Sequence, residues 1–320
     1  MSNRYLLTAL TALFSIALMF IGTKCSQKKT AETVKIGFVY NADRATAYTI
    51  NFFRTQTELE DTFGDKVKVY SKYNIGEDVS DCERAIEALI QENGCRLIFC
   101  VSYGHGKAAK NMAQKYPNVQ FCHATGTNAH TAGIENFHNA FASIYQGRYL
   151  AGVAAGLKLN EMIEEGKITA EQAKIGYVGA FPYAEVKSGY TSFFLGARSV
   201  CPSATMDVTY TNSWFDIALE REAALNLINS GCVLISQHAD SEGAPKACEE
   251  RGVPNVAYNI STISMGPTTA LISSKIDWAP YFKLIIDATS KGESFDADWC
   301  GDFGTGSVQL TELNEKVAAE

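Results

Sequence analysis

The stretch KIGYVGAFPYAEVKSGYTSFFLGARSVCPSATMDVTYT, residues 174–211, decides the fold class. An apolar run of strand length (174–180) is followed by a longer helical pattern (184–200) and then by a second run of strand length (206–211). Strands that are continuously apolar and alternate with helices are typical of a parallel sheet covered on both faces. We therefore expect an α/β fold.

The same alternation continues on both sides of this stretch. The apolar pattern predicts further strands at residues 34–40, 67–73, 96–102, 119–124, 233–237 and 256–259. It predicts further helices at residues 48–63, 81–92, 106–115, 141–159, 217–229 and 241–249, with a loop at 126–136. The chain has 320 residues, 46% of them apolar, which is enough for two cores. We expect two lobes, each with a mainly parallel sheet flanked by helices.

The C-terminal part continues beyond the second unit. A strand at 270–276 and a helix at 280–290 have no obvious place there, and we expect both to return to the first lobe. Repeated crossings form a hinge, which lets two lobes close over a ligand. The glycine-containing segment 300–320 is expected to lie against the second lobe. The predicted boundaries are 34–137 with 263–292 for the N-terminal lobe, and 138–262 with 293–320 for the C-terminal lobe.

The N-terminus has the pattern of an export signal. Arg4 precedes an uncharged run at 5–21, and Cys25 follows soon after. We expect a signal peptide at 1–24, a lipid-modified Cys25 and a tether at 25–33, which would anchor the protein to the extracytoplasmic face of the cell membrane. An uncleaved anchor and simple secretion are alternatives, because an apolar run of about 17 residues is near the lower limit for a membrane span. All three place the folded part outside the cytoplasm.

The charge balance excludes some partners. The chain has 28 basic and 35 acidic residues. Residues 1–24 contain Arg4 and Lys24 and no acid, so the remainder has 26 bases against 35 acids and a formal charge of −9. Nucleic acids and anionic lipid surfaces require a basic partner surface. We therefore expect no nucleic-acid partner.

Nine cysteines are present, and eight remain if Cys25 carries lipid. An even number outside the cytoplasm permits disulfides. However, Cys100 and Cys122 lie within predicted buried strands, where cysteine behaves as a small hydrophobic residue. No pair has the CxxC spacing of a zinc or redox site, so we expect no metal. The pattern favours buried free thiols, with one or two disulfides as the alternative.

Aromatic and polar side chains follow several predicted strands. Trp214 follows the strand at 206–211, and His238 and Asp240 follow the strand at 233–237. Tyr48 and Phe52 lie in the first strand-to-helix connection. Open α/β sheets bind ligands at the carboxyl ends of their strands. Aromatic residues from two distant parts of the chain suggest a flat ligand held between rings.

Enzyme motifs are missing. The turn Ser102-Tyr103-Gly104-His105-Gly106 follows a predicted strand but lacks the G-x-S-x-G order of a nucleophile elbow. Its backbone amides, at the start of a helix, suit a polar ligand atom instead. No P-loop or complete G-x-G-x-x-G fingerprint is present. We expect a binding protein rather than an enzyme, with no cofactor.

The segment YQGRYLAGVAAG, residues 145–156, resembles a signature of the basic membrane protein family, the substrate-binding lipoproteins of a class of bacterial ABC importers. Similar stretches follow the family in the same order at 113–121, 174–186, 196–200, 211–216 and 237–240. The resemblance extends over about residues 34 to 310. It implies a type I periplasmic-binding-protein fold, a purine nucleoside or nucleobase as ligand, and an ABC permease as membrane partner. We expect a monomer.

The resemblance also implies site residues. Trp214 matches the family position whose ring stacks on the base, and Tyr48 is the candidate for the opposite face. Stacking on an aromatic side chain stabilises a base by about 1 to 3 kcal/mol without reading its edge. His238 and Asp240 lie in the expected second-lobe site loop, where a carboxylate accepts from a purine N–H or a ribose hydroxyl. The remaining expected ligand residues are Asp43, Asn51, Phe52, Tyr103, His123, Phe181, Glu185, Asn259 and Lys275.

One departure bears on the ligand. Relatives tend to carry an acidic residue where this chain has Asn259-Ile260-Ser261, and its absence favours a free base over a nucleoside. The predicted function is capture of a purine for delivery to a permease. Another flat heterocycle or a sugar, such as riboflavin or ribose, is the alternative ligand, because the same fold binds these with different loop residues. A sensor that signals to a partner on closure is the alternative class.

Overall fold

The computed structural model describes residues 33–43 and 46–318. The predicted signal peptide, Cys25 and the tether up to residue 32 lie outside the described residues. In the part of the chain that is described, no helix has both the length and the apolar character needed to cross a membrane.

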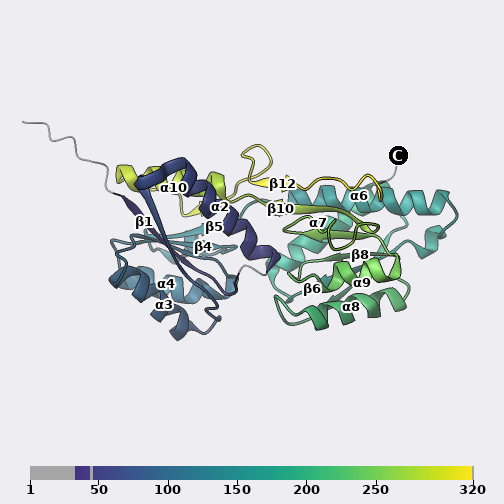
Figure 1. Ribbon diagram of the computed structural model, residues 1–320, viewed down its shortest axis with the longest axis horizontal. Helices are drawn as coiled ribbons and strands as arrows, with labels where there is room; N and C mark the ends of the chain where they lie inside the picture. Colours follow the sequence, from purple (N-terminus) through teal and green to yellow (C-terminus); the bar gives the residue numbers. More distant parts are fainter. Residues whose placement is uncertain (1–32, 44–45, 319–320) are drawn as a thin grey trace, which may run out of the picture. The chain divides into compact units, whose positions relative to one another are not determined.

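The first sheet has the strand order β11-β5-β4-β3-β1-β2, and all its pairs are parallel. Its strands are β1 (Val34–Val39), β2 (Val67–Lys72), β3 (Leu97–Cys100), β4 (Gln120–Ala124), β5 (Phe137–Ala140) and β11 (Asp298–Trp299). The helices of this lobe are α2 (Ala47–Phe63), α3 (Val79–Gln91), α4 (Gly106–Lys115), the short α5 (Ala129–Ala132) and α10 (Ala279–Lys291), with 3-10 turns η2 (Gly64–Lys66) and η3 (Tyr103–His105). Helices α2 and α10 lie together on one face of the sheet, and α3 and α4 lie together on the other (Figure 1).

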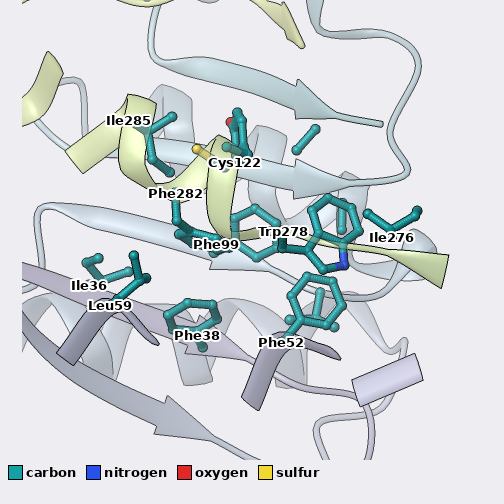
Figure 2. Close-up of a cluster of buried hydrophobic side chains, with 14 of the residues drawn as sticks. Ile36, Phe38, Phe52, Leu59, Phe99, Cys122, Ile276, Trp278, Phe282 and Ile285 are labelled. Carbon is teal, nitrogen blue, oxygen red and sulfur yellow. The ribbon is translucent and has the colours of Figure 1, made fainter. Parts of the chain in front are cut away.

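Aromatic side chains dominate the core under α2 and α10 (Figure 2). Phe52 stacks on Trp278 with 4.6 Å between ring centroids, and Phe282 approaches Phe99 at 4.7 Å. Ile276, at the end of a second-sheet strand, belongs to the same cluster. This core therefore continues into the connection between the two lobes.

The second sheet has the order β12-β10-β9-β8-β6-β7 and is parallel except for the β10–β12 pair. Its strands are β6 (Lys174–Gly179), β7 (Thr205–Tyr210), β8 (Leu234–Gln237), β9 (Asn255–Tyr258), β10 (Ala270–Ile276) and β12 (Val308–Leu310). The helices are α6 (Ile144–Glu164), α7 (Ala184–Val200), α8 (Ile217–Asn229) and α9 (Gly243–Arg251), with a 3-10 turn η4 (Ala170–Gln172). Helix α6 packs on α7, and α8 on α9. The prediction of two mainly parallel sheets flanked by helices is confirmed.

The strand pairing shows that the predicted lobe boundaries are wrong at three places. The strand expected to return to the first lobe, β10, pairs with β9 in the second sheet, and only α10 returns. The expected loop at 126–136 contains α5 and leads into β5, a strand that the pattern missed because the polar His138 and Asn139 stand between its two apolar residues. β11 pairs with β5 in the first sheet, although its residues were assigned to the second lobe. The chain therefore passes between the sheets after β5, after β10 and after β11.

The eight cysteines that the structure describes are all free, which corrects the alternative of disulfides within this part of the chain. Seven are buried and Cys300 is exposed. Burial raises the pKa of the Cys122 thiol to about 12, because a thiolate is poorly solvated in an apolar core. Buried thiols of this kind are chemically inert.

Alkylation of the native protein is expected to modify Cys300 and to leave the seven buried cysteines unmodified. The reason is access, since the thiol of Cys300 is the exposed one among those described, although burial and Asp298 raise its pKa and slow the reaction. Peptide mapping by mass spectrometry after iodoacetamide treatment measures this, with denatured, unreduced protein as the control. A buried cysteine that reacts as fast as Cys300, or that stays protected after denaturation, contradicts the prediction.

Candidate ligand-binding cavity

A small cavity lies at the carboxyl ends of the strands of both sheets. Its lining residues from the first lobe are Asn41, Tyr48, Ser102, Tyr103 and Thr125. Those from the second lobe are Glu185, Trp214, His238, Asp240, Tyr258 and Asn259. Most of them end a strand or follow one within a few residues, which is where open α/β sheets bind ligands.

Trp214 forms the aromatic wall on the second-lobe side. Its ring lies 5.3 Å from that of Phe181 and 6.0 Å from that of Tyr183. Its indole Nε1–H donates to Glu77 Oε1 at 3.2 Å, and Glu77 also accepts from Ser102 Oγ at 2.7 Å. Glu77 precedes α3, so this hydrogen bond joins the two lobes. The orientation of the Trp214 ring is thereby fixed from the first lobe.

Other contacts also join the lobes around the cavity. The rings of Tyr103 and Tyr183 stack at 5.1 Å with 28° between their planes. The backbone N–H of Ala47 donates to the carbonyl of Asp240 at 3.2 Å. These contacts, with the hydrogen bond between Trp214 and Glu77, hold the two lobes against each other at the cavity, as in the closed form of a two-lobed receptor.

Tyr48 lies at the start of α2 on the first-lobe side. Its hydroxyl donates to the carbonyl of Val101 at 2.8 Å, and its ring meets Phe52 edge to face at 5.1 Å. Burial raises the pKa of Tyr48 well above its ordinary value, and the Glu185 charge adds to the effect. Tyr48 therefore stays neutral and offers an anchored ring to the cavity.

Two buried carboxyl groups line the second-lobe side. Asp240 Oδ1 accepts from Asn259 Nδ2 at 2.9 Å, and Glu185 Oε1 lies 3.5 Å from His238 Nε2. Burial raises the pKa of Asp240 well above its ordinary value, and the neighbouring Glu220 raises it further. Of the described residues that line the cavity, none is a lysine or an arginine. The lining therefore suits a neutral, donor-bearing ligand better than an anion.

Three lining residues contribute buried polar atoms that have no hydrogen-bond partner among the described residues. These atoms are Asn41 Oδ1, Thr125 Oγ1 and Tyr258 OH. A buried polar group without a partner costs about 1–3 kcal/mol. A ligand or water that bonds these atoms recovers that free energy, so they favour a polar occupant.

Seven of the predicted ligand residues come together in this cavity: Tyr48, Tyr103, Glu185, Trp214, His238, Asp240 and Asn259. The other predicted residues do not line it. Phe52 is fully buried against Trp278 in the first-lobe core, one turn of α2 beyond Tyr48. Phe181 packs behind Trp214. Asn51 supports the wall indirectly, since its Nδ2 donates to the carbonyl of Asn259 at 2.9 Å.

Three more predicted residues lie outside the cavity. His123 Nε2 is held at 3.0 Å from the carbonyls of Ser102 and Tyr103, behind the first-lobe wall. Asp43 is exposed, and its carbonyl accepts from Thr49 Oγ1 at 2.6 Å. Lys275 lines a separate surface pocket with Arg54 and Glu312. A position near the end of a strand therefore does not by itself show whether a side chain lines the cavity.

Four lining residues were not predicted: Asn41, Ser102, Thr125 and Tyr258. Asn41, Ser102 and Thr125 follow β1, β3 and β4 within two residues, and Tyr258 is the last residue of β9. These residues could have been found by considering the residues at the end of every predicted strand, and not only of those strands that an aromatic or charged residue follows.

A cavity at the carboxyl ends of two similar parallel sheets, with several chain crossings between them, defines a two-lobed solute-binding protein with the type I periplasmic-binding fold. The model of the Bmp family, described as ABC transporter substrate-binding protein PnrA-like, matches residues 55–320, and the chain belongs to this family. Such proteins are extracytoplasmic, bind small molecules and work with a membrane permease. The family and the fold are those of receptors and not of enzymes.

Two relatives are similar over most of this chain. A purine-binding protein of Brucella abortus is 34% identical over 275 residues, which cover 84% of this chain and 73% of that protein. A protein of Haloferax volcanii, named as a candidate ABC transporter glucose-binding protein, is 36% identical over 242 residues, or 75% of this chain and 58% of that protein.

Solved structures share the fold. An ABC transporter solute-binding protein from Aeropyrum pernix has a TM-score of 0.73 at 15% identity, covering 87% of this chain and 76% of that chain. One from Conexibacter woesei has a TM-score of 0.69 at 18% identity, covering 88% and 89%.

Proposed function

We propose that this receptor captures a purine nucleobase or nucleoside and delivers it to an ABC permease. The observation that carries the proposal is the half-buried Trp214 ring beside two buried carboxyl groups, Glu185 and Asp240, in one cavity. The ring supplies a stacking surface, and carboxylates accept from the N–H groups of a base. The similarity to a purine-binding protein supports the same ligand class.

The lining also bears on the form of the purine. A nucleotide would bring a phosphate into a cavity whose described lining has two carboxyl groups and no lysine or arginine. Burial of a phosphate without a cationic partner costs several kcal/mol. A base or nucleoside avoids this cost, and the buried Asp240 is available to a ribose hydroxyl or a ring N–H.

Calorimetric titration of the purified protein tests the ligand, after unfolding and refolding to remove ligand carried through purification. The panel is adenine, guanine, hypoxanthine, their nucleosides, adenosine monophosphate, riboflavin, ribose and glucose. Micromolar or tighter binding confined to uncharged purines supports the proposal and ranks base against nucleoside. Glucose is included because of the similarity to the Haloferax volcanii protein, and binding of a sugar or riboflavin alone would overturn the purine assignment.

We also propose that Cys25 carries the lipid that anchors the receptor, with residues 1–24 removed as a signal peptide. The support is the uncharged run at 5–21 followed by the polar segment after Cys25. Metabolic labelling with a radioactive fatty acid tests it. Label in the unaltered protein that is lost in Cys25→Ser supports the anchor, and equal label in both contradicts it.

A further inference from the structure

Arg148, in α6, is a fully buried cation directly behind the second-lobe wall of the cavity. Its guanidinium carbon lies 4.2 Å from the centroid of the Tyr258 ring, which it faces in a cation–π contact. Its Nη2 donates to the carbonyl of Gln237 at 2.8 Å and to the hydroxyl of Tyr177. These contacts fix the guanidinium between α6 and the ends of β6, β8 and β9. Arg148 does not line the cavity, so it acts there only through its neighbours.

The neighbour that does reach the cavity is His238, the first residue after β8, with 3% of its surface exposed. Nη2 of Arg148 lies 3.3 Å from Nδ1 of His238. The two N–H groups of Nη2 are shared among three acceptors, namely the Gln237 carbonyl, the Tyr177 hydroxyl and Nδ1 of His238. Because a guanidinium is positively charged and has donors only, it favours the tautomer in which Nδ1 presents its lone pair and the proton of the neutral ring is on Nε2. Burial lowers the pKa of His238, and the charge of Arg148 lowers it further, while Glu185 opposes the shift. The neutral ring with Nε2–H is the resulting form.

Nε2 of His238 lies 3.5 Å from Oε1 of Glu185, and both residues line the cavity. This distance is at the outer limit of a hydrogen bond. The wall therefore presents one donor, Nε2–H, next to one acceptor, the Glu185 carboxylate. A purine edge has the complementary pair, an acceptor beside an N–H donor: N1 with the 6-amino group in adenine, or O6 with N1–H in guanine.

We infer that Arg148 is a positioning residue that holds His238 in the Nε2–H tautomer, so that His238 and Glu185 together read the edge of the bound purine. The tautomer of His238 is inferred from its own contact with Arg148 and does not depend on the ligand. The edge-reading half rests on the proposed purine function. NMR tests the tautomer of His238, and calorimetry tests the recognition of the purine edge.

Nitrogen-15 NMR of the ligand-free protein with labelled histidine measures the tautomer directly. The unaltered protein is expected to show a protonated Nε2 and an unprotonated Nδ1 for His238, assigned through His238→Gln. Arg148→Met, which retains much of the side-chain volume, is expected to populate the other tautomer. Arg148→Lys, which retains a charged donor, is expected to restore Nε2–H in part. A proton on Nδ1 in the unaltered protein, or an unchanged tautomer in Arg148→Met, overturns the inference.

Calorimetry with adenine and guanine measures the effect on recognition. Arg148→Met is expected to weaken binding of the preferred base by about tenfold, as for loss of one hydrogen bond in the site, and Arg148→Lys by less. Arg198→Met is the matched control, because Arg198 is exposed in α7 and stands away from the cavity. Equal affinity of Arg148→Met and the unaltered protein overturns the recognition half. Absence of purine binding in the unaltered protein defeats the proposed function, while the tautomer measurement still decides the role of Arg148. If Arg148→Met does not fold, the tautomer in the unaltered protein and in Arg148→Lys decides it.

Discussion

Replacing Trp214 with alanine is expected to weaken purine binding by at least tenfold. Stacking of a base on an aromatic side chain contributes about 1–3 kcal/mol, and each 1.4 kcal/mol is a factor of ten in affinity. The substitution also removes the Nε1–H that donates to Glu77 across the lobes, so the closed state loses a contact together with the stacking surface. Both losses act in the same direction. Calorimetric titration with adenine and guanine measures the change, and circular dichroism confirms that the variant is folded.

The matched control is Trp214→Phe, which keeps an aromatic ring and loses the indole N–H. It separates the two contributions of Trp214. A small loss in Trp214→Phe with a large loss in Trp214→Ala assigns the effect to stacking, whereas equal losses assign it to the hydrogen bond with Glu77. Unchanged affinity in a folded Trp214→Ala protein would remove Trp214 from the ligand site and leave the cavity without its stacking surface.

The fold could be predicted from sequence wherever an element is long and its apolar period is unbroken. Helix α7 and strand β10 have the predicted bounds, 184–200 and 270–276, because each has a continuous pattern between polar or turn-forming neighbours. The sheet to which β10 belongs could not be predicted. Pairing with β9 depends on the register of two parallel strands, which no local pattern encodes. Strand β5 was missed because its two central residues, His138 and Asn139, are polar and interrupt the apolar run.

The site could be predicted in part for a related reason. The rule that ligands bind at strand ends and the family resemblance together gave seven lining residues, including the two acids and Trp214. The prediction failed for Phe52, which lies one turn of α2 beyond Tyr48 in the first-lobe core, and for Lys275, which lies in the strand β10 and lines another pocket. Arg148 lies in the segment 145–156 that resembles the family signature, but no local sequence pattern indicates an arginine buried behind the residues that line the cavity. Its role is visible only through its contacts with His238 and Tyr258.

Glu220, in α8, is a buried acid outside the cavity with a large expected effect on stability. It is fully buried, its Oε1 accepts from the backbone N–H of Asp216 at 3.1 Å, and its Oε2 accepts from that of Ser241 at 3.0 Å. Burial raises the pKa of Glu220 from 4.5 to about 7, and the nearby Asp216 also raises it, although the hydrogen bonds oppose the shift. The charge of Glu220 in turn raises the pKa of Asp240. Two carboxyl groups are thus coupled next to the ligand site.

The pKa of Glu220 in the folded protein lies above its value in the unfolded chain, so between pH 4.5 and about 7 the folded state holds a proton that the unfolded state has lost. The stability that Glu220 contributes is therefore fully present below pH 4.5 and is lost as the pH rises to about 7. At 1.36 kcal/mol per pKa unit, the loss is on the order of 3 kcal/mol. Glu220→Gln, which cannot ionise, is expected to gain stability relative to the unaltered protein by this amount over the same interval.

Urea unfolding of ligand-free protein at pH 4.5, 5.5, 6.5 and 7.5 measures the difference in free energy of unfolding between Glu220→Gln and the unaltered protein. The contributions of other titrating groups largely cancel in this difference, except for Asp240, whose pKa falls when the Glu220 charge is removed and which therefore adds to the gain. Glu222→Gln is the matched control, because Glu222 is exposed in the same helix and its difference should stay flat. Parallel curves for Glu220→Gln and the unaltered protein would show that the pKa of Glu220 is the same in the folded and unfolded states. The two hydrogen bonds from Asp216 and Ser241 would then offset its burial.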